Sequence, residues 1–211
     1  MPIDANGTRT SVNAGTQDRP TAVGNAFKAI EQAASPRRGL ARPDATADTA
    51  ATTAAGSTAE TQGIKRSIRP FREVDQRKLE DALPANAKHL AKAFIDEGRK
   101  HNLDPVALVA ISKHETGNFT SSAFKNKNNA MGISNARGPT MQKSAEASIA
   151  KMAEGLSNPN GYYKGKNTIG EIANIYAPVG AGNDPRGLNN GWGKGVAKYA
   201  DDFAAKVRPE G

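Results

Sequence analysis

Residues 104–116 read DPVALVAISKHET, a pattern that predicts an amphipathic helix with a glutamate in its last turn. Asp104 is a favourable N-cap residue. Pro105 fits the first turn, where its missing N–H would have no partner in any case. The apolar side chains of this helix include Leu108, Val109 and Ile111. The sequence therefore presents Glu115 at the end of a helix, directly before a loop.

Glu115 is the candidate general acid of a glycosidase. A glycosidic oxygen is a poor leaving group, so its scission needs a carboxylic acid that keeps a proton at working pH. A partly apolar cleft would raise the pKa in this way, and the segment Met131-Gly132-Ile133 could form its opposite wall. Most helical glutamates are solvated instead. Position alone does not separate these two interpretations of Glu115.

The composition predicts one folded domain with a long polar leader. The chain has 211 residues, of which 37% are hydrophobic and 5% aromatic, and its mean hydropathy is -0.62. Residues 45–59 are almost purely alanine and threonine, which leaves little to bury. We expect a disordered, low-complexity leader over residues 1–73, suited to export or targeting, and a folded domain over residues 74–211.

The formal net charge of +8 and the pI near 9.7 favour polyanionic surroundings, such as nucleic acid, anionic lipid or bacterial envelope polymers. We expect no nucleic-acid partner, because the basic residues are scattered, no recognised motif is present and aromatic residues are few. The absence of cysteine excludes a thiolate nucleophile and a cysteine zinc site. The three histidines show no ligand spacing, so we expect no metal and no cofactor.

No apolar run is long enough to predict a membrane span, and the first residues lack the basic and apolar regions of a secretory signal peptide. If the protein leaves the cytoplasm, we expect it to use another route.

Apolar periodicity predicts a mainly α domain with a small β component. We expect helices over residues 86–101, 104–116, 144–156 and 192–207, and another that Thr168 caps. Residues 118–140 are rich in serine, lysine, asparagine and glycine, which favours loops or a short hairpin beside a cleft. The expected fold is a compact, mainly helical domain with a loop or short hairpin beside a cleft.

Three motifs carry a resemblance to a known family. They are KHETG at residues 113–117, NNAMGI at 128–133, and YAP at 176–178, which is followed by GAGNDP and then by Asn190 and Trp192. In this order and spacing the chain resembles bacterial peptidoglycan-cleaving enzymes of the lysozyme superfamily, most closely the glucosaminidase-like group that includes flagellar peptidoglycan hydrolases. The resemblance spans about residues 86–203. It implies that the domain over residues 74–211 is a glycan-cleaving domain with an α+β lysozyme-like fold.

The resemblance implies roles for individual residues. Glu115 corresponds to the general acid, and Tyr176 to a tyrosine that faces it. Asn128 and Asn129 correspond to the loop that lines the sugar cleft. The substrate-binding set that we expect comprises Asn128, Asn129, Met131, Tyr162 and Trp192. Tyr176 has a second interpretation, because a tyrosine at a helix end is often a core residue with its hydroxyl at the surface.

A second carboxylate is harder to assign. Between Glu115 and Asp184 the only acidic residues are on predicted helices: Glu146, Glu154 and Glu171. Asp184 is therefore the best candidate for a second catalytic carboxylate, although Asn-Asp-Pro is also a common turn. If Asp184 is structural, the substrate's N-acetyl group or its 6-hydroxyl must attack the anomeric carbon.

The expected function is cleavage of peptidoglycan glycan strands, as a β-N-acetylglucosaminidase. The first alternative is a lytic transglycosylase, although the chain lacks the Glu-Ser and Gly-Leu-Met-Gln pattern usual in that group. The second is a non-catalytic peptidoglycan-binding module. We expect a monomer that is secreted or periplasmic, with components of a specialised secretion system as partners, for example as a type III secretion substrate. A phage lysin could have the same composition.

Overall fold

The computed structural model describes residues 64–135, 137–180 and 187–208. Most of the expected leader, and the loop that contains Asp184, lie outside the described residues. The expectations for these two segments therefore remain predictions.

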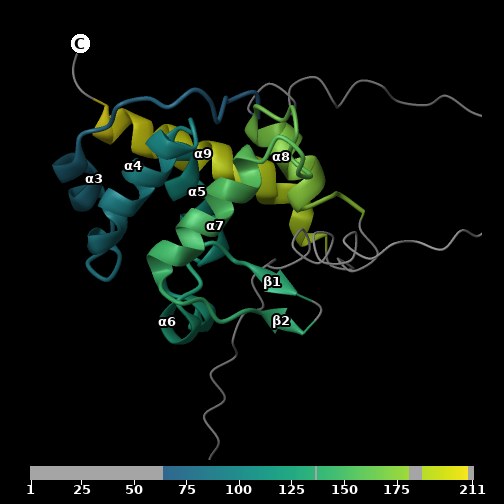
Figure 1. Ribbon diagram of the computed structural model, residues 1–211, viewed down its shortest axis with the longest axis horizontal. Coiled ribbons are helices and arrows are strands. Elements are labelled where there is room, and N and C mark those ends of the chain that lie inside the picture. The colour runs from purple at the N-terminus through teal and green to yellow at the C-terminus, as the bar shows by residue number, and fades with distance from the viewer. Residues whose placement is uncertain (1–63, 136, 181–186, 209–211) are drawn as a thin grey trace, which may run out of the picture.

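The described part of the chain is mainly helical (Figure 1). Its α-helices are α3 (Gln76–Ala82), α4 (Ala91–Lys100), α5 (Pro105–Glu115), α6 (Ser122–Lys127), α7 (Ala145–Ser157), α8 (Ile169–Tyr176) and α9 (Trp192–Val207). Two short 3-10 helices are η1 (Lys88–Leu90) and η2 (Leu188–Gly191). The strands β1 (Ser134–Asn135) and β2 (Gly138–Pro139) pair antiparallel, with Ser134 opposite Pro139. The prediction of a mainly α fold with a short hairpin is confirmed.

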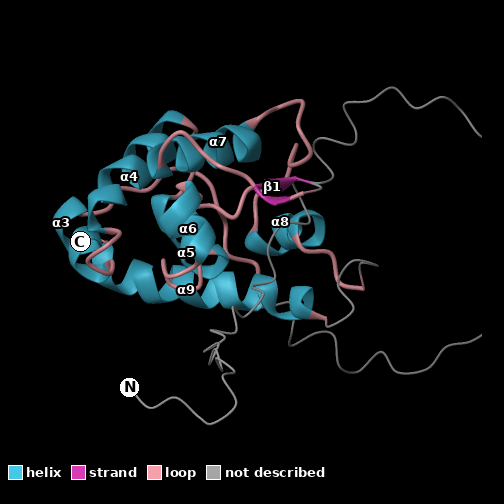
Figure 2. Ribbon diagram, turned by 90° about the horizontal axis from the view of Figure 1, so that it is seen from below, coloured by secondary structure: helices cyan, strands magenta, loops and turns pink. Residues whose placement is uncertain are grey.

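Helix α5 is the centre of the fold and is buried on all sides. Every residue from Pro105 to Ser112 is buried. Helix α9 packs along α5, α4 packs against it as well, and Figure 2 shows α5 between them. The expectation of an amphipathic helix is therefore wrong for this segment. A helix that is apolar all round is typical of a core position rather than of a surface position.

The helix boundaries follow the sequence signals. The Asp104 side chain accepts a hydrogen bond from the backbone N–H of Val106, 3.0 Å away, and so caps α5. The Thr168 side chain and Glu171 form a reciprocal capping box at α8. Helix α9 has the predicted bounds. The expected helix over residues 86–101 instead begins with the 3-10 turn η1 and continues as α4.

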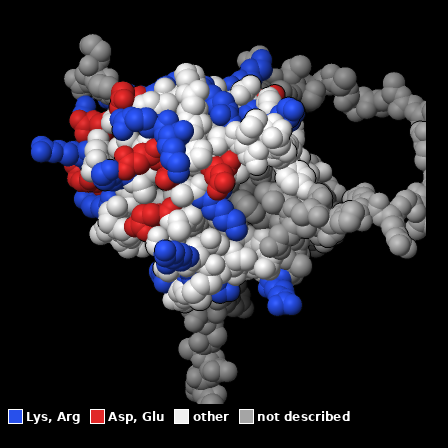
Figure 3. Space-filling view, in the orientation of Figure 1, with Lys and Arg blue, Asp and Glu red and all other residues white. Residues whose placement is uncertain are grey.

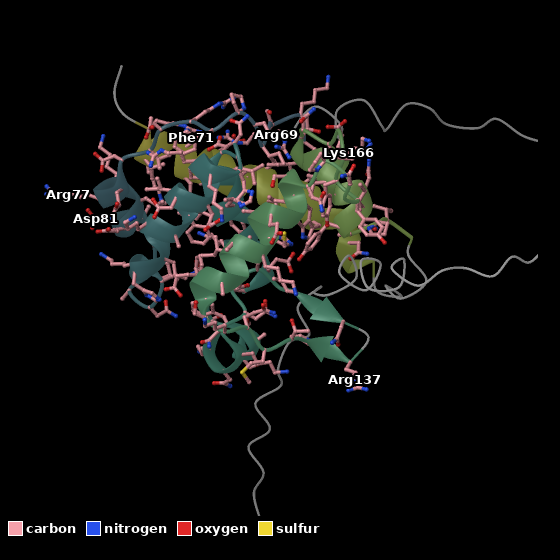
Figure 4. The ribbon with its side chains drawn as sticks, viewed as in Figure 1. Arg69, Phe71, Arg77, Asp81, Arg137 and Lys166 are labelled. Carbon is pink, nitrogen blue, oxygen red and sulfur yellow. The ribbon has the colours of Figure 1, made fainter. Side chains whose placement is uncertain are left out.

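Residues 64–73, which precede the expected start of the domain, pack onto it. Ile68 is buried in the core. Its N–H donates to the carbonyl of Asn167, and its own carbonyl accepts from the N–H of Asp104, both at 2.8 Å. Arg69 donates to the carbonyl of Leu156 at 2.6 Å, and Figure 4 shows Arg69 and Phe71 along this segment. The packed part of the chain therefore begins before residue 74.

The hairpin and α6 adjoin each other at one end of the molecule (Figure 1). The Lys127 side chain donates to the carbonyl of Pro139 at 3.0 Å, and Arg137 lies at the tip of the hairpin (Figure 4). Helix α6 falls in the stretch that was expected to be loop or hairpin. Its segment offers one buried side chain, Phe124, which meets Phe119 edge to face, so local periodicity could not reveal it.

Basic and acidic side chains are interspersed over α3 and α4 on the face that Figure 3 shows. Mixed charges of this kind suit a solvated surface better than a site for a polyanion. None of the helices in the described ranges is long and apolar enough to cross a membrane.

Candidate active site

Glu115 is the last residue of α5, and its side chain is buried, with 2% of its surface exposed. The Trp192 indole N–H donates a hydrogen bond to Glu115 Oε1 over 2.6 Å. Glu115 Oε2 is equally buried, and no described residue gives it a hydrogen bond. One carboxyl oxygen is therefore fixed by the protein, and the other remains available to a bound molecule.

Aromatic rings surround the carboxyl group. Trp192, at the start of α9, is fully buried, and Tyr176, at the end of α8, stacks on it with 4.9 Å between ring centroids. The Tyr176 hydroxyl donates to the backbone carbonyl of Met131 at 3.2 Å. Three segments that are far apart in the sequence thus meet around Glu115.

Burial raises the pKa of Glu115 to about 8. The hydrogen bond from Trp192, and next the nearby Tyr176 hydroxyl, act in the opposite direction, because they stabilise the charged form, but they do not cancel the effect of burial. The position at the C-terminal end of α5 also disfavours a negative charge. The carboxyl group therefore carries a proton at neutral pH, as a general acid must.

Tyr163 is a site residue that sequence reasoning missed. Its side chain is buried, and its hydroxyl has no hydrogen-bond partner in the described residues. Burial, and next the charge of Glu115, raise the pKa of Tyr163, so the two groups lie near each other. The adjacent Tyr162 is 38% exposed. Two adjacent tyrosines in a loop indicate that one ring can face the core, but the sequence does not predict which of the two does so.

The loop with Asn129 is held rigidly in place. The Asn129 side chain accepts from the N–H of Ile133 at 2.8 Å and donates to the carbonyls of Ile133 and Thr140. Ser112 of α5 donates to the carbonyl of Ala130 at 2.7 Å. These bonds fix the loop against α5, and the Asn129 amide is used in doing so.

The structure brings together only part of the predicted site. Glu115, Tyr176, Trp192 and the backbone of Met131 meet. Trp192 supports the acid from inside the core rather than offering an exposed ring. Asn128, in left-handed conformation, and Tyr162 are exposed. The substrate-binding roles of all the predicted residues remain predictions.

A second carboxylate does not adjoin Glu115 in the described part of the chain. No acidic side chain there contributes to the shifted pKa of Glu115. Glu171 is engaged in the capping box of α8, and Glu154 is exposed on α7. Nor do histidine, aspartate and glutamate side chains of these residues form a group that could hold a metal ion.

Two crystal structures of S. aureus autolysin E are similar to this structure. Each aligns with a TM-score of 0.50 and 16% sequence identity, and the alignment covers 70% of this chain and 75% of the autolysin chain. One is a complex with the muropeptide NAM-L-Ala-D-iGlu. The other is a catalytic mutant, with a glutamate replaced by alanine, in complex with the disaccharide NAG-NAM.

This likeness shows that the protein has a mainly α, lysozyme-like fold. No protein-family model and no curated protein matches the sequence.

Proposed function

We propose that this protein cleaves the glycan strands of bacterial peptidoglycan as a β-N-acetylglucosaminidase, with Glu115 as the general acid. The observation that carries the proposal is the state of Glu115, a carboxyl group that is buried, protonated at neutral pH and bonded through one oxygen only. Simple sugar binding does not require such an acid. This feature therefore favours an enzyme over a non-catalytic binding module.

The geometry suits proton transfer to a leaving group. Oε2 carries no hydrogen bond from the described residues, so its proton can pass to the glycosidic oxygen of a substrate that reaches it. The Trp192 N–H then stabilises the carboxylate that forms at Glu115. Because the site excludes water, this interaction is stronger than it would be in solution.

The comparisons support the choice of substrate. Autolysin E shares the fold, and its two structures hold peptidoglycan fragments. The sequence motifs around Glu115, Asn129 and Tyr176 favour the same class of substrate. We extend this substrate class to the present chain as part of the proposal.

The second step separates the proposed hydrolase from a lytic transglycosylase. The described residues supply no carboxylate beside Glu115, which favours attack by the substrate's N-acetyl group or its 6-hydroxyl unless Asp184 contributes. Attack by the 6-hydroxyl would give anhydro ends. Attack by the N-acetyl group, or a reaction assisted by Asp184, would end with the addition of water and give reducing ends. We retain the hydrolase as the first proposal because the transglycosylase motif is absent.

The test compares wild-type protein with Glu115→Gln on purified cell walls. The amide has nearly the same shape but cannot donate the proton, so we expect cleavage to fall by about 100- to 10,000-fold. Glu154→Gln, which alters an exposed acid on α7, is the matched control and should cleave normally. Activity of Glu115→Gln within a few-fold of wild type would refute the proposal.

Mass spectrometry of the released fragments resolves the reaction. Reducing N-acetylglucosamine ends support the proposed glucosaminidase, and anhydro ends would identify a transglycosylase. Asp184→Asn belongs in the same assay. A loss close to that of Glu115→Gln would assign Asp184 to the chemistry, whereas a small loss would assign it to the turn.

The substrate also implies a location. Peptidoglycan lies outside the cytoplasm, so we propose that the protein acts as a monomer in the periplasm or after secretion, and that components of a specialised secretion system, such as type III, export it. An export assay in which residues 1–63 are deleted tests this route. Export that is unchanged by the deletion would refute a signal in those residues.

A further inference from the structure

Helix α9 begins with Trp192-Gly193-Lys194-Gly195, and glycine is a poor helix former. The first turn of α9 therefore contains two residues that weaken it locally. Packing gives the reason. A methyl group on Gly193 would lie 3.0 Å from Ile64, and one on Gly195 would lie 2.9 Å from two atoms of the His114 ring.

Some helical glycines in the described chain lack this constraint, although Gly98 of α4 shares it, with atoms of Leu103 and Pro105 at 2.9 Å. A methyl group on Gly155, inside α7, would have no atom within 4 Å. The close approach at Gly195 is distinguished by its partner, the His114 ring. It lets the His114 ring lie directly against this turn.

His114 in turn contacts the tryptophan that holds the acid. Its ring centroid lies 5.9 Å from that of Trp192, at an interplanar angle of 73°. Tyr176 stacks on the indole as well, at 4.9 Å and 28°. Consecutive helical residues point in different directions, so His114 can support the indole while Glu115 accepts its N–H.

Burial lowers the pKa of His114, so its imidazole is neutral at neutral pH. A neutral ring can pack against Trp192 and Tyr199 without the cost of a buried charge. No charged side chain in the described ranges is a cause of this shift in the pKa of His114. The contact is therefore one of packing.

We propose that His114 and Gly195 are positioning residues, which together hold the Trp192 indole where its N–H reaches Glu115. Neither residue needs to touch the substrate. His114 supplies the supporting ring, and Gly195 leaves the space in which that ring lies.

The chain has a single tryptophan, so the indole N–H gives one resolved signal in a proton–nitrogen correlation spectrum of the full-length protein. In wild-type protein this signal should shift with a midpoint of about pH 8, as Glu115 ionises. Glu115→Gln should abolish the shift. Tyr163 and Tyr176 have raised pKa values and His114 a lowered one, so none of them accounts for that midpoint.

His114→Ala and Gly195→Ala are the test variants. The hydrogen bond from Trp192 lowers the pKa of Glu115, so its weakening should move the midpoint to higher pH and reduce the size of the shift. Gly155→Ala, a glycine-to-alanine change in an open helix position, should leave both unchanged. Gly195→Ala also keeps the test available if His114→Ala does not fold.

A measurement of wall cleavage by these variants rests on the proposed function, whereas the measurement of the indole N–H signal does not. On cell walls, the two variants should lower kcat at least about tenfold with little change in KM, and extend activity to higher pH. If wild-type protein does not cleave walls, the proposed function fails while the spectroscopic result still decides the positioning role. A wild-type indole signal that does not follow Glu115, or a midpoint in Gly195→Ala equal to that in Gly155→Ala, would overturn the inference.

Discussion

The two ends of α5 each carry a buried carboxyl group, and their surroundings are opposite. At the N-terminal end, Asp104 Oδ2 lies 2.6 Å from Arg208, 3.8 Å from Arg66 and 3.9 Å from Arg72. At the C-terminal end, Glu115 has aromatic neighbours and one short hydrogen bond, from Trp192. Both side chains are almost completely excluded from solvent.

The comparison shows that the effect of burial on the charge of a carboxyl group depends on its neighbours. Arginine side chains compensate the charge of Asp104, which also caps the helix where the peptide dipoles favour an anion. Glu115 receives no cation and lies where those dipoles disfavour an anion, so burial leaves it protonated. The first environment suits stability, and the second suits acid catalysis.

The largest effect should appear in the pH dependence of stability. Below about pH 4.5 Glu115 is protonated in both the folded and the unfolded chain. As the pH rises towards about 8, only the unfolded chain ionises, so the free energy of unfolding of wild-type protein should fall, by up to about 5 kcal/mol. Glu115→Gln should lack this component. Urea unfolding of wild-type protein and Glu115→Gln across this pH range measures the difference. If the free energies of unfolding of the two proteins changed in parallel with pH, the prediction would be contradicted.

Asp104→Asn tests the other end of the helix. Asparagine can still cap α5, but the buried negative charge that faces three arginines is lost, and among the described residues only Arg66 keeps another carboxylate, that of Asp201. We therefore expect a loss of about 2–4 kcal/mol in the free energy of unfolding. The estimate lies below that for a fully buried pair because the arginines are partly exposed. Wall cleavage well below the melting temperature should be nearly normal. A stability within about 0.5 kcal/mol of wild type would show that the arginines do not depend on Asp104.

Tyr163→Phe tests whether the Tyr163 hydroxyl belongs to the site at the C-terminal end of α5. The hydroxyl has no partner among the described residues, so its removal should not lower the free energy of unfolding. If it contacts a bound sugar beside Glu115, cleavage should fall about tenfold. Tyr199→Phe keeps a comparable ring outside the site and is the control. Equal activity of the two variants would remove Tyr163 from the site.

The smallest effect should come from deletion of residues 1–63. This deletion leaves Arg66, Ile68 and Arg72 in place, so unfolding and wall cleavage should change little, by less than about 0.5 kcal/mol in stability. Deletion of residues 1–73 removes all three and should destabilise at least as much as Asp104→Asn. If both deletions behave alike, the contacts of residues 64–73 contribute nothing to stability.

Sequence reasoning succeeded where signals are local. The cap at Asp104, the capping box at Thr168 and the bounds of α9 depend on residues that are neighbours in the chain, and all three were readable. Glu115 and Tyr176 were selected from motifs. The structure then placed them at one site, with Trp192 between α8 and α5.

The features that could not be predicted from the sequence depend on tertiary packing. The complete burial of α5, and the packing of Ile68 before the expected domain boundary, result from segments that are distant in the chain. Tyr163 and Tyr162 are adjacent and chemically identical, and only the fold decides which one faces Glu115. The substrate-binding role of Trp192 remains a prediction, and the sequence did not reveal its burial or its hydrogen bond to Glu115.

Helix α9 and the following Arg208 come after α5 in the chain, and they supply a partner to both carboxyl groups, those of Glu115 and Asp104. A chain that is still growing on the ribosome has already made the acid but not the indole that fixes it. Translation adds roughly 5–20 residues per second, so several seconds separate Glu115 from Trp192. The hydrogen bond from Trp192 to Glu115 can thus form only after α9 has been synthesised, and a product that terminates before α9 would lack it.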